Sequence, residues 1–163
     1  MKTLIVLRHA KSSWKDNNLA DYERPLNKRG KYDAPRMGAL LVRQDLVPNL
    51  IISSSAKRAA TTAKAVAENC GYEDEIQYSR HLYAAWPEAY IEALNDLMSD
   101  YPRVMVVGHN PGIEDLVEEL TGEWVRMPTA ALAQIDLAIG RWSDLALEAS
   151  GKLVNVWWPK ELD

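Results

Sequence analysis

Two histidines follow apolar segments, and their positions suggest chemistry on an oxyanion. Arg8 and His9 come directly after the apolar run 4–7, and His109 comes two residues after the apolar run 104–107. A short continuous apolar run is typical of a buried parallel strand, and open α/β sheets place their ligands at the carboxyl ends of such strands. A guanidinium beside an imidazole at that edge indicates an oxyanion, which His9 would either attack or bind.

A third polar segment lies between the two histidines. Residues 53–63 (SSSAKRAATTA) follow the apolar run 50–52 and enter an Ala-rich segment. Arg58 falls in the first turn of the helix predicted there, where unpaired N–H groups and the helix dipole attract anions. Arginine adds charge-assisted, often bidentate, hydrogen bonds to phosphate. Alone, Arg58 would be read as a solvated residue at a helix start, but together with the two histidine segments it predicts a phosphate pocket.

The elements that must position these residues alternate between strands and helices. This alternation predicts an α/β fold with three layers, in which helices cover both faces of a mostly parallel sheet. The C-terminal strands are expected to be partly antiparallel. The predicted strands span residues 3–7, 50–52, 76–78, 104–107, 131–138 and 152–158.

Capping residues delimit the first two predicted helices. Asn27 is a typical N-cap for a helix that runs to Arg43, and Pro35 predicts a kink or a late start inside it. The hydroxyls of residues 53–55 are predicted to cap the Ala-rich helix, which Gly71 would end.

Two further helices follow. Pro87 suits the first turn of the third helix, whose predicted buried residues are Tyr90, Ile91, Leu94, Leu97 and Met98. Asn110 and Pro111 resemble the N-cap and first residue of the fourth helix, and Gly122 is its predicted end.

Length and composition limit the possible classes of protein. A chain of 163 residues with 47% apolar content predicts one domain, residues 1–163, with one core. The net charge of -4 argues against a general nucleic-acid binder. Cys70 is the single cysteine, which excludes an intrachain disulfide and disfavours a structural zinc site. Without an apolar stretch near the ~20 residues of a membrane span or a signal-peptide core, we expect a cytoplasmic protein that does not bind membranes.

The ordered motifs resemble the histidine phosphatase superfamily over nearly the whole chain. They are the Arg8-His9 pair, the pattern Ser-x-x-x-Arg-Ala-x-x-Thr-Ala at 54–63, and Gly-His-Asn-Pro at 108–111. The segment 21–30 (DYERPLNKRG) and the segment 157–160 (WWPK) are similar to its small SixA-type branch, the phosphohistidine phosphatases. The resemblance implies a phosphoglycerate mutase-like fold and a phosphatase that needs no cofactor or metal.

The resemblance also implies roles for four residues. His9 would be the nucleophile and become transiently phosphorylated, while Arg8, Arg58 and His109 would surround the phosphoryl oxygens. Physical chemistry agrees, because phosphoryl transfer needs in-line positioning and stabilisation of charge on the equatorial oxygens. A neutral imidazole is easily available near neutral pH.

Three further residues are weaker candidates for substrate binding. Ser12 lies close to the predicted nucleophile, Arg24 lies in the branch motif, and Asn110 follows His109. The third histidine, His81, has no phosphate context, and we expect an ordinary, partly buried side chain.

The chain departs from the family pattern at two positions. Ala10 stands where the family usually has glycine, a change that is tolerated if the backbone keeps a negative φ. Ala84 stands where many relatives carry an acidic general acid, and Glu88 is the nearest substitute. An alkoxide leaving group benefits from a placed proton donor, whereas an imidazole nitrogen is readily protonated near neutral pH.

The preferred hypothesis is therefore a metal-independent phosphatase that hydrolyses phosphohistidine on a signalling protein. One alternative is a phosphatase or mutase that acts on small-molecule phosphate esters. An alternative of another class is a non-catalytic module that binds phosphorylated groups.

Overall fold

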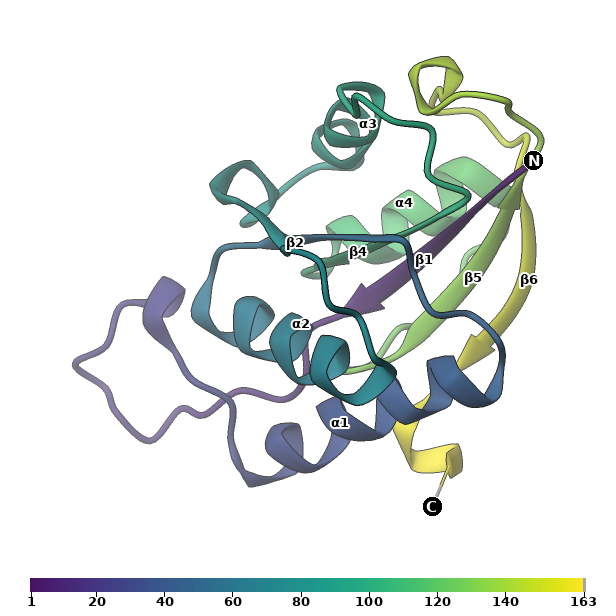
Figure 1. Ribbon diagram of the computed structural model, residues 1–163. Coiled ribbons are helices and arrows are strands. Elements are labelled where there is room, and N and C mark those ends of the chain that lie inside the picture. The colour runs from purple at the N-terminus through teal and green to yellow at the C-terminus, as the bar shows by residue number, and fades with distance from the viewer. Residues whose placement is uncertain (163) are drawn as a thin grey trace.

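One mixed sheet forms the centre of the molecule. The computed structural model describes residues 1–162, and six strands in this part of the chain form a sheet in the order β3-β2-β4-β1-β5-β6 (Figure 1). The strands are β1 (Lys2–Arg8), β2 (Leu50–Ser54), β3 (Gln77–Ser79), β4 (Arg103–Gly108), β5 (Leu132–Leu137) and β6 (Lys152–Trp157).

Strand direction divides the sheet into two parts. β1, β2, β3 and β4 run parallel to their neighbours among themselves, whereas β5 is antiparallel to both β1 and β6. The mostly parallel α/β fold with antiparallel strands near the C-terminus is thus confirmed. β1 and β4 are adjacent although most of the chain's helices lie between them in sequence, so crossover connections assemble the centre of the sheet.

The helices cover the two faces of the sheet in pairs. They are α1 (Lys28–Arg43), α2 (Lys57–Cys70), α3 (Pro87–Asn95) and α4 (Gly112–Thr121). Figure 1 shows α1 and α2 on one face and α3 and α4 on the other. None of the helices in residues 1–162 combines the length and the apolar character that a bilayer crossing needs.

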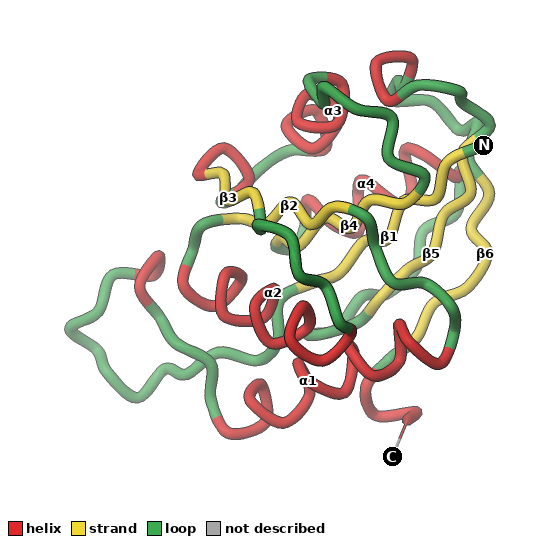
Figure 2. The backbone as a smooth tube through the Cα atoms, in the orientation of Figure 1, coloured by secondary structure: helices red, strands yellow, loops and turns green. Residues whose placement is uncertain are grey.

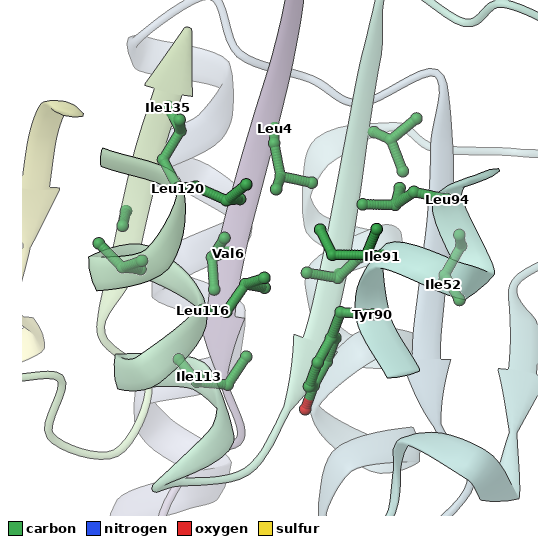
Figure 3. Close-up of a cluster of buried hydrophobic side chains, with 14 of the residues drawn as sticks. Leu4, Val6, Ile52, Tyr90, Ile91, Leu94, Ile113, Leu116, Leu120 and Ile135 are labelled. Atoms are coloured by element: carbon green, nitrogen blue, oxygen red, sulfur yellow. The ribbon is translucent and has the colours of Figure 1, made fainter. Parts of the chain in front are cut away.

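The continuous apolar run of β1 is explained by this arrangement. Successive side chains of a strand point to opposite faces, so Leu4 and Val6 pack with α3 and α4, while Ile5 and Leu7 pack with α1 and α2. All four are fully buried. Figure 3 shows the first of these clusters, with Leu4 and Val6 among the side chains of the two helices that cover them.

Most predicted helix limits agree with the structure. Asn27 caps α1, since its side-chain oxygen accepts a hydrogen bond from the N–H of Gly30. The helix begins at Lys28 and continues through Pro35, so the alternative of a late start is wrong. Gly71 and Gly122 follow α2 and α4 in the left-handed conformation that glycine adopts without a Cβ clash.

Four local predictions need correction. Ala56, not a serine, occupies the N-cap of α2, which begins at Lys57, and Oγ of Ser54 contacts His109 and the N–H of Ala56 instead. α4 begins at Gly112 with Pro111 as its N-cap, one residue later than predicted. Met98 is 98% exposed because α3 already ends at Asn95. His81 is exposed rather than partly buried.

A long connection joins β1 to α1. Figure 2 shows residues 9–27 as a loop that extends away from the sheet and contains the short 3-10 helix Asp21–Glu23. The two ends of the loop lie side by side, because Ser12 forms an isolated antiparallel bridge with Leu26. This places the polar residues of the loop beside the ends of β1 and β2.

Candidate active site

Three strand ends meet at one edge of the sheet. Arg8 at the end of β1 is in register with Gly108 at the end of β4, and Ser53 of β2 is in register with Val107. The residues that follow these strands therefore lie side by side. All four predicted catalytic residues line one cavity of about 320 Å³ at this edge, together with Lys11, Ser12, Trp14, Arg24, Asn110 and Thr129.

The backbone around His9 is held from three sides. Its N–H donates to the carbonyl of Gly108, and its own carbonyl accepts from the N–H of Ala130. The N–H of Ala10 donates to Oγ1 of Thr62 at 3.0 Å, which ties the turn to α2. Positive φ among described non-glycine residues is confined to Asp45, Ala84 and Ala130, so Ala10 keeps the negative φ that its side chain requires.

The imidazole of His9 has a defined tautomer. Its Nδ1 lies 2.7 Å from the carbonyl oxygen of Ala10, and because a carbonyl only accepts, Nδ1 carries the proton. Burial, aided by the positive charges of Arg58 and Arg8, lowers the pKa of His9 to about 3. At neutral pH the ring is therefore uncharged, and its lone pair is on Nε2.

His109 has the complementary arrangement. Its Nε2 lies 2.8 Å from Oγ of Ser54, and that hydroxyl already accepts the N–H of Ala56. No other acceptor lies within hydrogen-bond distance of this buried hydroxyl among residues 1–162, so its proton goes to Nε2 and the ring proton lies on Nδ1. Nδ1 is buried and has no hydrogen-bond partner in the described part of the chain, so it is available to donate to a ligand.

The close packing around His109 explains the preceding glycine. A Cβ on Gly108 would lie 1.9 Å from the hydroxyl oxygen of Tyr90, which accepts the N–H of His109. Burial lowers the pKa of His109 to about 4, so this ring is also neutral at pH 7. The centroids of the His9 and His109 rings are 5.0 Å apart.

Arg8, the last residue of β1, places a guanidinium group in the wall of the cavity. Its Nη1 donates to the carbonyl oxygen of Met127 at 3.2 Å, and its Nε is buried without a hydrogen-bond partner among residues 1–162. Burial lowers the pKa of Arg8 from its very high ordinary value, while the charge of Glu114 opposes that shift. Glu114 also accepts the N–H of Met127, which fixes the same loop.

Arg58 is oriented by a carboxylate that the sequence analysis did not single out. Nη1 of Arg58 donates to the backbone oxygen of Asp21 at 2.7 Å, and Nη2 donates to its Oδ2 at 3.0 Å. Tyr83 donates to the same Oδ2, and Arg24 donates to Oδ1 at 2.9 Å. These donors, Tyr83 foremost, hold the pKa of Asp21 well below its usual range. The sequence signal that could have identified this carboxylate is its place in the segment 21–30, which resembles the SixA-type motif.

The weaker candidates also lie in the cavity. Arg24 is buried, bonds Oγ of Ser12, and places its guanidinium 3.1 Å from the ring centroid of Trp14. Asn110 donates to the carbonyl of Met127 and accepts the N–H of Glu114, so its amide supports the surrounding loop.

The candidate general acid does not join the group. Glu88 is exposed on the first turn of α3 and does not line the cavity. Ala84 and His109 line a neighbouring cavity of about 240 Å³, and its one carboxylate among the described residues is Asp115. Asp115 was not among the residues predicted from the sequence.

The arrangement is suited to binding a tetrahedral oxyanion. The guanidinium groups of Arg8, Arg24 and Arg58 line the cavity together with a neutral imidazole that has a free lone pair. Within residues 1–162, no group of three or more His, Cys, Asp or Glu side chains is placed to hold a metal ion.

Comparisons with known proteins agree with this fold and site. A family model described as the histidine phosphatase superfamily (branch 1) matches residues 4–83. An uncharacterized chloroplastic protein of Arabidopsis thaliana is 33% identical over 160 residues, which cover 92% of this chain and 73% of the relative.

Solved structures give the same result. A candidate phosphohistidine phosphatase SixA from Agrobacterium tumefaciens superposes with a TM-score of 0.82 at 28% identity, over 97% of this chain and 98% of that one. A protein histidine phosphatase SixA complexed with tungstate superposes with a TM-score of 0.83 at 22% identity, over 99% of both chains, and supports the fold alone.

Fold and site together define an α/β protein with an oxyanion site at the carboxyl ends of its parallel strands. The chain belongs to the histidine phosphatase superfamily and is of the SixA type.

Proposed function

We propose that the chain hydrolyses phosphohistidine on a protein, through a phosphorylated His9 and without a metal ion. One observation carries the proposal. The imidazole of His9 is neutral, its proton is directed to Nδ1 by the carbonyl of Ala10, and the residue lines a cavity with Arg8 and Arg58. A nucleophile requires a free lone pair, and the proton on Nδ1 leaves that lone pair on Nε2.

The reaction divides into two transfers. Nε2 of His9 attacks phosphorus, the bond between phosphorus and the substrate nitrogen breaks, and that nitrogen takes a proton from solvent. Water then attacks phosphorus on His9, which releases inorganic phosphate and restores the neutral ring. In both transfers Arg8 and Arg58 stabilise charge on the equatorial oxygens, and Nδ1–H of His109 donates to one of them.

The environment of Ala84 supports the preference for a nitrogen leaving group. Ala84 lines the cavity beside His109 but offers no proton, and Glu88 points to solvent. We expect Ala84→Glu to raise kcat/KM for a phosphate ester such as phosphoserine by about tenfold or more, with little change for phosphohistidine. Parallel assays of both substrates check this, and Ala138→Glu, at an exposed position that lines neither cavity, is the control. An equal gain on both substrates would contradict the inference from Ala84 to a nitrogen leaving group. The alternative of a phosphatase or mutase for small-molecule esters would then be preferred.

Trapping the intermediate tests the proposal directly. We expect quenching of a reaction with a ³²P-labelled phosphohistidine peptide in alkaline denaturant to leave acid-labile, base-stable label on the wild-type chain. His9→Ala should carry no label and lose turnover by about 10⁴-fold or more, as expected for a nucleophile. His81→Ala, which changes an exposed histidine, is the matched control. Label that persists on the His9 variant would assign attack to another residue. Phosphate binding without label or turnover on the wild type would favour the non-catalytic module.

A further inference from the structure

Two additional cavities flank the phosphoryl site near the start of α1. Their volumes are about 500 Å³ and about 460 Å³. The larger one shares Lys11 and Thr129 with the cavity that contains His9, and the two flanking cavities share Arg29. The three hollows are therefore neighbours that share wall residues.

Exposed cations concentrate on this surface. We call the following six side chains the basic face: Lys11, Lys15, Lys28, Lys31, Arg126 and Lys160. Within the described part of the chain, none of the six forms an ion pair. The whole chain has a net charge of -4, so this surface has the opposite sign to the protein that carries it.

Carboxylates do not neutralise the basic face from within. Among described residues, Asp33 is the one acidic side chain that lines the flanking cavities. It is 3% exposed and accepts hydrogen bonds from Arg29 and Arg36 on its own helix. Its charge is therefore already paired, and the lysines remain open to solvent.

The larger cavity also has a fixed wall. Nε1 of Trp158 donates to the carbonyl of Arg126 at 2.9 Å, and the Arg126 guanidinium lies 5.7 Å from the ring centroid. This contact joins the C-terminal segment to the loop that follows α4, so the basic face has a preformed shape as well as a charge.

We propose that the basic face binds an acidic segment of the protein that carries the phosphorylated histidine. The inference rests on the proposed function, since it assigns a docking surface to that substrate. Opposite charges speed encounter and set the orientation of two proteins. Charges on the face act over about 8–10 Å at ordinary salt. An acidic enzyme would otherwise repel an acidic partner, so attraction at this one surface would direct the phosphohistidine to His9.

Synthetic peptides of matched length provide the test. One peptide carries a central phosphohistidine flanked by glutamates, a second carries it flanked by serine and glutamine, and free phosphohistidine is the third substrate. For the wild type at low salt, we expect kcat/KM for the acidic peptide to exceed that for the neutral peptide on the order of tenfold. The ratio should approach one at 0.5 M salt, because screening removes the attraction.

A charge-reversal pair identifies the surface. Lys28→Glu with Lys31→Glu should bring the acidic-to-neutral ratio to about one, with turnover of free phosphohistidine unchanged. Both positions are exposed in the first turn of α1, where glutamate is compatible with the helix dipole. Lys64→Glu with Lys152→Glu is the matched control, because both lysines are exposed and lie outside the basic face.

The outcomes separate the inference from the proposed function. Hydrolysis of both peptides with a wild-type ratio near one, or an equal loss in both double variants, would overturn the basic face as a docking surface. If no phosphohistidine substrate is hydrolysed, the proposed function fails. Fluorescence anisotropy with the unphosphorylated acidic peptide then tests the face alone, and binding that the Lys28/Lys31 pair abolishes would still support it.

Discussion

The site is built from two regions that hold their residues in different ways. At the strand ends, His9 is fixed by backbone hydrogen bonds to Gly108 and Ala130. In the loop between β1 and α1, Asp21 is positioned through its carboxylate. That group accepts hydrogen bonds from Arg24, Arg58 and Tyr83. The sheet thus fixes the imidazole of His9, while side-chain charges in the loop orient the guanidinium of Arg58.

The two regions also differ in burial. His9 and His109 are both 6% exposed, whereas the Asp21 side chain is 48% exposed. Desolvation therefore keeps the histidines neutral, and hydrogen bonding keeps Asp21 charged. Perturbing the sheet end should affect chemistry and pH-dependent stability, whereas perturbing the loop should affect mainly the placement of Arg58.

Removing the cation that joins both regions should have the largest effect. We expect Arg58→Ala to lower kcat by about 10²–10³-fold, because one preorganised donor to the phosphoryl oxygens is lost. The fold should persist, since the guanidinium bonds only the loop residue Asp21. Steady-state kinetics and a thermal unfolding midpoint measure the two effects, with the exposed neighbour Lys57→Ala as control. Gross unfolding of the Arg58 variant would assign this arginine a structural role instead.

The second largest effect should come from acid, which should lower the free energy of unfolding through the two histidines at the strand ends. The folded pKa values of His9 and His109 are about 3 and about 4, and an unfolded histidine has a pKa near 6.5. Between pH 7 and pH 5 the unfolded chain takes up protons that the folded chain refuses, so the free energy of unfolding should fall by about 2 kcal/mol for each ring.

Urea unfolding at pH 7, 6 and 5 measures this dependence. His109→Gln should reduce the fall in the free energy of unfolding, whereas His81→Gln should leave it unchanged because His81 is exposed. An unaltered fall in the His109 variant would show that this ring is not neutral by burial.

Neutralising the loop carboxylate should have the smallest effect of the three. Asp21→Asn keeps the backbone oxygen that bonds Nη1 of Arg58 but weakens the three side-chain contacts. We expect about a tenfold loss in kcat/KM, mainly through KM, as typical for a residue that orients another. Kinetics with phosphohistidine measure it, and Glu23→Gln, which neutralises an exposed carboxylate of the same loop, is the control. A loss as large as that of Arg58→Ala would mean that the loop, rather than the sheet, governs catalysis.

The sequence predicted the sheet-end region well and the loop region poorly. Apolar runs, strand ends and most helix limits are local patterns, so the convergence of His9, Arg58 and His109 followed from the alternation of strands and helices. The failures have a common origin. Ser54 was expected to cap a helix but bonds His109, which is 55 residues away, and the helix that should have buried Met98 ended sooner.

The sequence by itself determined which residues end the parallel strands, because apolar periodicity and backbone geometry operate within a few residues. It thereby determined that two arginines and two histidines would share one edge of the sheet. Tertiary structure alone decided which nitrogen of each histidine ring carries a proton. It also decided that Asp21 bonds Arg58, which is 37 residues away, and that Glu88 does not line the cavity. Side-chain partners and desolvation depend on how distant segments pack, and no local pattern encodes that packing.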